Sequence, residues 1–225
     1  MEKREARFKK ITPVYLALFW AAQLALGCYY TAQARPYYAV LGFCGILFPF
    51  ALRLVYKICR FRPIYQLDFL LTLFFFLLYT VGLDLRGYSV IPYYDKFAHT
   101  LTGVVFALIG LIVFYYLKPE KKLSEKDLPL VCVFEICFSL AIAALWELSE
   151  FAISLLFGTD PQNVLATGVT DTMLDILVCL VGTLVVLIPV SLYFKKKRTS
   201  LLMGIFDVMF HRNIVREEAP GRTKT

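Results

Sequence analysis

The sequence has few of the motifs on which soluble enzymes most often rely. It contains two histidines, and its six cysteines form no C-x-x-C pair, which argues against a dithiol redox site or a zinc ribbon. It also has no glycine-rich phosphate loop, no Ser-His-Asp order and no convincing internal repeat. Nucleotide-binding P-loop proteins, triad hydrolases and repeat solenoids are therefore disfavoured, and the cysteines are interpreted as small apolar packing residues.

Charged residues are scarce as well, at 18% of the chain, whereas 59% of the residues are hydrophobic and the mean hydropathy is +0.66. Soluble domains average about 45–50% apolar residues. The charges gather in short blocks between apolar runs of roughly 20 residues, the helix length that crosses about 30 Å of hydrocarbon. We therefore predict an all-α, polytopic membrane bundle of about six transmembrane helices. The runs lie near residues 13–32, 37–57, 65–84, 95–117, 129–157 and 171–194.

The formal net charge of +7 comes from basic residues that flank the apolar runs, which indicates a membrane surface rather than nucleic acid as the partner. Dense basic blocks alternate with connections that hold few basic residues. Because positive charge marks the cytoplasmic side, both termini are predicted to be cytoplasmic. The dense blocks are residues 3–10, 57–62, 118–126 and 195–198, and the sparse connections hold Arg35, Arg86 and Lys96.

The two ends of the chain carry further predictions. Residues 13–32 are either a retained first span or the core of a signal peptide with a cleavage-like Ala32-Gln33-Ala34; the length of the run favours the span. Residues 1–198 are predicted to form the transmembrane domain. Residues 199–225 are predicted to be a cytoplasmic tail with a short interfacial helix. Within the bundle, Asp68 and Asp84 are expected at solvated helix ends.

Three apolar runs carry ionisable residues at helical spacing, which is costly in a membrane and needs a reason. Asp95 and His99 are four residues apart, as are Asp171 and Asp175, while Glu147 and Glu150 are three apart. Each pair therefore shares one helix face. The Glu147 and Glu150 side chains point inward together if Trp146 and Phe151 face outward.

The predicted topology brings these pairs to the same half of the membrane. The fourth and sixth spans enter from outside, so Asp95, His99, Asp171 and Asp175 lie in their outer turns. The fifth span leaves on the same side, which puts Glu147 roughly 15 Å below its outer end. Simpler structural roles compete for some of them, since Asp95 and Asp171 can cap their helices.

The charges determine the chemistry of such a site. Lys96 is counted in the outer connection, so no lysine or arginine is expected beside the acids. Five carboxylates at close range repel one another, so either protons or a cation must neutralise some of them. Hard oxygen donors with one imidazole suit Mn, Mg, Zn or Fe. The candidate metal ligands are His99, Glu147, Asp175, Asp95 and Asp171, and the candidate catalytic residues are Glu150, Glu147, His99 and Asp175.

Three sequence blocks, at residues 94–103, 145–151 and 171–182, resemble the signature blocks of the YjdF-type membrane proteins and, more distantly, of the VanZ-like family. VanZ-like proteins read Asp-Lys-x-x-His in the first block, a Glu in the second, and an Asp with Asn four and Gly seven residues later in the third. Cys179 stands where that Asn would be, which favours the YjdF-type side. The resemblance implies a bacterial cytoplasmic membrane. The matching residues are Asp95, Lys96, His99, Glu147, Asp175 and Gly182.

Three functions remain open at this point. The first is a metal-dependent enzyme that acts on a lipid or cell-envelope precursor, with Glu150 as general base and membrane lipids as partners. The second is a proton- or cation-coupled transporter, in which Glu135 would join the outer acids as a relay. The third is a structural or accessory subunit whose polar residues hold helices together.

Overall fold

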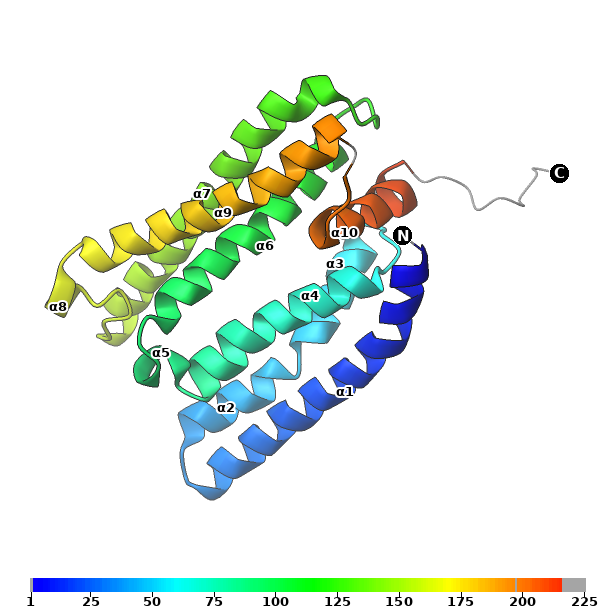
Figure 1. The fold of residues 1–225 in the computed structure, drawn as a ribbon. Helices are drawn as coiled ribbons and strands as arrows, with labels where there is room; N and C mark the ends of the chain where they lie inside the picture. The colour runs from blue at the N-terminus through cyan, green and yellow to red at the C-terminus, as the bar shows by residue number, and fades with distance from the viewer. Residues whose placement is uncertain (1, 197, 216–225) are drawn as a thin grey trace. The chain divides into compact units, whose positions relative to one another are not determined.

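A computed structural model describes residues 2–196 and 198–215 of the chain (Figure 1). Every regular element in this part is a helix, and five helices are long and apolar enough to cross a membrane, or six if one bent pair is a single span. The predicted all-α, multi-pass membrane fold is confirmed. The elements are α1 (Glu2–Ala32), α2 (Pro36–Gly45), α3 (Phe48–Ile58), α4 (Tyr65–Phe75), the π-helix η1 (Phe76–Asp84), α5 (Gly87–Val90), α6 (Tyr94–Leu117), the 3₁₀ turn η2 (Glu125–Asp127), α7 (Leu128–Phe157), α8 (Val164–Thr167), α9 (Thr170–Lys196), α10 (Leu201–Met209) and the π-turn η3 (Phe210–Ile214).

The chain forms two compact units. Unit 1 contains the described residues up to Tyr94 together with those from Asp207 onward, and unit 2 is Asp95–Phe206. The second apolar run, predicted as one span, is broken in unit 1 into α2 and α3, which are bent by 41°. Pro49 sits in the first turn of α3, where its missing N–H leaves no hydrogen bond unmade.

The buried acids of unit 1 correct the prediction that Asp68 and Asp84 lie at solvated helix ends. Asp68 is 1% exposed and pairs with Arg53 at 2.7 Å. Asp84 is fully buried, and the Gln23 amide donates to its Oδ2 at 3.0 Å while accepting from Thr80 Oγ1. Neighbouring helices supply a donor to Oδ2 of each carboxylate, which the linear sequence does not reveal. Oδ1 of each is buried without a hydrogen-bond partner among the described residues.

Unit 2 is built around three long helices, α6, α7 and α9. Helices α6 and α9 approach so closely that a Cβ added at Gly103 would lie 2.0 Å from the Cys179 carbonyl oxygen, and one added at Gly182 would lie 2.1 Å from the Thr100 carbonyl oxygen. Small residues permit this contact in membrane bundles. It fixes α6 against α9 within two turns of His99 and Asp175.

The predicted interfacial helix forms as α10, but its apolar side chains pack against protein. Met203 and Phe206 are fully buried, and the Phe206 ring lies 5.6 Å from the ring of Tyr115 within unit 2. A membrane-surface position for residues 201–210 stays a prediction, as do the domain limits and the cytoplasmic termini. Lys197 and the tail residues 216–225 lie outside the described residues.

Candidate functional site

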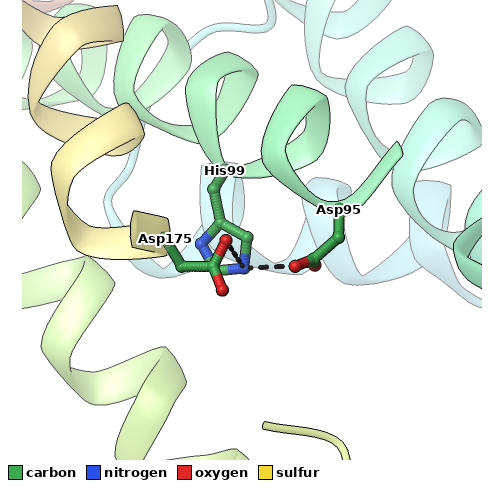
Figure 2. Close-up of side chains that lie close together, drawn as sticks. All are labelled: Asp95, His99 and Asp175. Carbon is green, nitrogen blue, oxygen red and sulfur yellow. Dashed lines mark ion pairs between the residues drawn. The ribbon is translucent and has the colours of Figure 1, made fainter. Parts of the chain in front are cut away.

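The first turns of α6 and α9 supply most of the site in unit 2. Asp95 and His99 follow each other by one turn on α6, and Asp175 projects from α9 towards them (Figure 2). Asp95 and Asp171 both lie in the first turn of their helices, as predicted. Because the helix N-terminus favours negative charge, these two carboxylates are compatible with their positions even without a ligand.

The His99 ring is the geometric centre of the site. Its Nε2 atom lies 3.5 Å from Asp95 Oδ1, 3.8 Å from Asp175 Oδ1 and 4.0 Å from Glu147 Oε1. A hydrogen bond from a ring nitrogen would be about 0.5 Å shorter than the shortest of these. Nε2 is therefore surrounded by carboxylate oxygens from three helices without a normal hydrogen bond to any of the three. His99, Glu147 and Asp175 are all buried.

Lys96 corrects the expectation that the carboxylates have no cationic companion. Its Nζ atom donates to Asp171 Oδ1 at 2.6 Å, to both oxygens of Asp175 at 2.8 Å and to Asp95 Oδ2 at 3.0 Å. The prediction was wrong because Lys96 was counted with the connection, whereas α6 already begins at Tyr94. The signal that could have found it is its place between Asp95 and His99 in the first signature block.

Glu147 occupies the third side of the site. Gln162, from the connection between α7 and α8, donates to the Glu147 carbonyl oxygen and to Oε2, both at 3.1 Å. The other carboxylate oxygen, Oε1, faces His99 and is buried without a hydrogen-bond partner among the described residues. One oxygen is thus held by the loop and the other is free to bind. Sequence reasoning did not identify Gln162.

Glu150 lies one turn further along α7, and its carboxylate is held by Trp146. Its Oε1 accepts from the indole N–H of Trp146 at 2.8 Å. Trp146 and Phe151 are 49% and 50% exposed, so the condition under which Glu147 and Glu150 can point inward together is met. Glu150 interacts electrostatically with Glu147, Asp95 and Asp175. Its role as a general base stays a prediction.

The donor set fits a divalent cation. Metal–ligand bonds of about 2.0–2.2 Å at tetrahedral angles separate the ligand atoms by about 3.4 Å, close to the distances around His99 Nε2. Asp95, His99 and Asp175 each offer one atom within 4.8 Å of the others. The carboxylates of Asp95, Glu147, Asp171 and Asp175 with the Lys96 ammonium carry a net charge of −3 when ionised, so one divalent cation would neutralise most of it.

Asp171 is placed differently from the other predicted ligands. Its Oδ1 makes the shortest of the Lys96 contacts, and its carbonyl oxygen lies 3.4 Å from the same ammonium. It therefore positions Lys96, which in turn orients Asp95 and Asp175. A ligand role for Asp171 stays a prediction.

Comparison with known families agrees with the membrane architecture. A family model described as "Predicted membrane protein (DUF2238)" matches residues 12–196, which is most of the chain and includes every residue of the site. The chain belongs to this family. No curated protein and no solved structure gives a significant match.

Proposed function

We propose that this chain is a YjdF-type protein of the bacterial cytoplasmic membrane that binds a divalent cation through Asp95, His99, Glu147 and Asp175. One observation carries the proposal: His99 Nε2 faces three carboxylate oxygens at 3.5–4.0 Å, and one of them, Glu147 Oε1, is buried without a donor. An imidazole with carboxylates suits Zn, Mn or Fe, and Mg less well. The distant VanZ-like resemblance belongs to the same proposal.

The site residues have separate tasks in this proposal. A bound divalent cation would supply Lewis acidity and activate water or polarise a phosphoryl or acyl oxygen. Lys96 donates to one oxygen of Asp95 and to both oxygens of Asp175, which fixes the orientation of these two carboxylates. Gln162 does the same for Glu147. Glu150, one turn away, can accept a proton once it leaves the Trp146 indole.

The substrate class follows from the surroundings of the site. Trp146, Phe151 and Leu174 are 49%, 50% and 43% exposed next to Glu147, Glu150 and Asp175. Such a border of apolar side chains lies in lipid when the helices span a membrane. A substrate with an apolar tail and a polar head, such as a lipid-linked or envelope precursor, would reach the acids from the membrane.

Cation- or proton-coupled transport is the second candidate. One observation favours it: Glu135, twelve residues before Glu147 on α7, is also buried. An enzyme confined to the outer end of unit 2 has no use for a carboxyl group at that depth.

The experiment is a measurement of metal content in detergent-purified protein after exchange into metal-free buffer. We expect about one equivalent of a transition metal in the wild type and at least a 10-fold loss in His99→Gln and in Glu147→Gln. The chain offers a matched control in its other histidine, and His211→Gln should retain the metal.

The outcomes separate the candidates. Metal retained in His99→Gln and Glu147→Gln would contradict the cation centre. If no metal binds in the wild type, even when Mn or Zn is added back, the polar cluster is structural. If the metal binds, hydrolysis of lipid-linked phosphates by reconstituted protein tests the enzyme, and metal flux into proteoliposomes tests the transporter.

A further inference from the structure

A single acid lies deep inside unit 2, away from the cation centre. Glu135 is 0% exposed, and neither of its carboxylate oxygens has a hydrogen-bond partner among the described residues. It precedes Glu147 by twelve residues, which is roughly 18 Å along a helix. Its surroundings are therefore independent of the metal ligands.

Glu135 belongs to a stripe along α7 at intervals of four residues. The stripe contains Glu135, Ser139, Ala143 and Glu147, and all four are buried. Neighbours in this stripe lie one turn apart on nearly the same face, and the direction turns by about 40° per step, so Glu135 and Glu147 point about 120° apart around the helix. The Ser139 hydroxyl, one turn from Glu135, also lacks a hydrogen-bond partner among the described residues. Two polar side chains thus lie next to each other in the interior with unused hydrogen-bonding capacity.

This stripe faces α9. One turn after Glu135, the Ser139 carbonyl oxygen lies 3.9 Å from the Cys179 thiol of α9. About one turn before Glu135, Cys132 hydrogen-bonds to Ser191 of α9. Glu135 is bracketed by these two contacts. Its carboxyl group is therefore held between helices rather than turned towards lipid.

No counter-ion reaches this carboxyl group from the packed helices of unit 2 in the described part of the chain. Cys132 on α7 interacts electrostatically with Glu135, and Lys195 near the end of α9 interacts with Cys132. Cys179 on α9 contacts Ser139, one turn from Glu135. The ionisable groups of α6 lie towards its two ends: Asp95, Lys96 and His99 at one, Tyr115 and Tyr116 at the other. An ionised carboxylate without a partner is strongly disfavoured in such an interior.

We infer that Glu135 is a proton-exchange site inside the membrane bundle, which takes up and releases one proton through the stripe that it shares with Ser139. The acid holds the proton at rest. In exchange, the carboxyl O–H gives its proton to the Ser139 hydroxyl oxygen as that hydroxyl gives its own proton to a water molecule. A proton delivered by water then restores the acid, with no change in oxidation state. This inference does not depend on the cation centre.

A purely structural role explains the same observations less well. A protonated carboxyl group that donates to nothing contributes less to helix packing than leucine or methionine of similar size. Membrane proteins keep such acids mainly where protons or ions move. Replacement of Glu135 by leucine should therefore stabilise the fold while it abolishes proton exchange.

The test combines infrared spectroscopy with proton flux in proteoliposomes. Wild type, Glu135→Gln and Glu135→Leu are compared with Glu120→Gln, a control in the exposed loop after α6. We expect a protonated-carboxyl C=O band, shifted in D₂O, in the wild type and in Glu120→Gln, and its loss in both Glu135 variants. Proton flux driven by a potassium diffusion potential should fall at least about 10-fold in Glu135→Gln.

Thermal unfolding and metal content complete the test. Glu135→Leu should unfold roughly 2–8 °C higher than the wild type. Metal binding should be unchanged in each Glu135 variant, so a failure of the cation centre and a failure of this inference are distinguishable. An unchanged C=O band in Glu135→Gln would overturn the inference, and so would wild-type flux in a folded Glu135→Gln protein.

Discussion

The buried acids of unit 1 and those of unit 2 differ in how well they are provided with donors. In unit 1, Glu5 accepts from the backbone N–H groups of Tyr65 and Gln66 and from Arg212, so both of its oxygens are used. Asp68 forms an ion pair with Arg53 at 2.7 Å, and among the described residues no second acid pairs with this arginine. In unit 2, by contrast, three aspartates share the single ammonium of Lys96.

This difference separates structural acids from acids that can bind a ligand. An acid with a donor of its own has its charge or its hydrogen-bonding capacity at least partly compensated, and it holds helices together. A cluster with more carboxylates than cations keeps excess negative charge, and burial makes that excess costly unless protons or metal ions enter. Unit 1 therefore contains acids that each have a donor of their own, although Oδ1 of Asp68 and Oδ1 of Asp84 are buried without a hydrogen-bond partner among the described residues. Unit 2 contains a cluster with more carboxylates than cations.

The largest effect is expected from Lys96→Met, which removes the shared ammonium and leaves three carboxylates without it. Loss of one partner from a buried ion pair costs about 3–5 kcal/mol, and the partial exposure of Asp95 and Lys96 brings the expected loss of unfolding free energy to about 3 kcal/mol. Thermal unfolding in the presence of a chelator measures it. Added Mn or Zn should restore more stability than it adds to the wild type, because the acids have lost their internal cation.

The control for Lys96→Met is Lys122→Met in the exposed loop between α6 and η2. It should leave the unfolding midpoint unchanged. Wild-type stability of Lys96→Met in chelator would mean that the aspartates do not need the ammonium, and the contrast with unit 1 would disappear.

The corresponding change in unit 1 is Arg53→Met, which removes the cation from a buried Asp68. The arginine side chain is 43% exposed, so we expect a smaller loss of about 2 kcal/mol. The double variant Arg53→Met with Asp68→Leu should recover most of it, and divalent cations should have no effect. A cation rescue of Arg53→Met would contradict the view that Asp68 is a structural acid.

A third prediction concerns the contact between α6 and α9 that positions the site. The Cβ of Gly103→Ala would meet the Cys179 carbonyl oxygen, so the helices must separate, at a cost of about 2 kcal/mol and a weaker affinity for metal. The matched control is Gly110→Ala, whose Cβ would meet the flexible Phe138 ring at 3.2 Å. It should be neutral or stabilising, since alanine favours helix by about 1 kcal/mol. Equal effects of the two changes would argue against a special role for the Gly103 contact.

The smallest expected effect on stability is that of Gln162→Ala, which releases one oxygen of Glu147. Loss of this hydrogen bond should cost about 1 kcal/mol, whereas the metal affinity should fall about 10-fold because Glu147 is no longer oriented. Equilibrium titration with Mn checks the affinity, with the exposed Gln33→Ala as control. An unchanged affinity would show that the loop does not orient the ligand.

Most of the fold follows from the sequence, since apolar run length and flanking charge determine where helices cross. The exceptions are local. The glycines and Pro49 of the second run allow a kink, but they do not determine that α2 and α3 separate by 41°. The π-helix Phe76–Asp84 contains Thr80, which contacts Gln23 from a distant part of the chain, and such contacts are not apparent in the local sequence.

The sequence predicts the acidic residues of the site, but it does not predict the side chains that donate hydrogen bonds to them. Spacing and topology predict that Asp95, His99, Glu147 and Asp175 converge, because unpaired acids are conspicuous in apolar runs. Lys96 and Gln162 are not conspicuous, since lysine and glutamine are ordinary in connections. Their roles depend on side-chain reach across helices, which the periodicity of one helix does not contain.

The most direct test of the cation centre is X-ray absorption spectroscopy of the protein loaded with one equivalent of Zn. We expect a first shell of one imidazole nitrogen and carboxylate oxygens at about 2.0–2.2 Å, and loss of the imidazole signal in His99→Gln but not in His211→Gln. A shell of oxygens alone, or an imidazole signal that persists in His99→Gln, would contradict a metal site centred on His99.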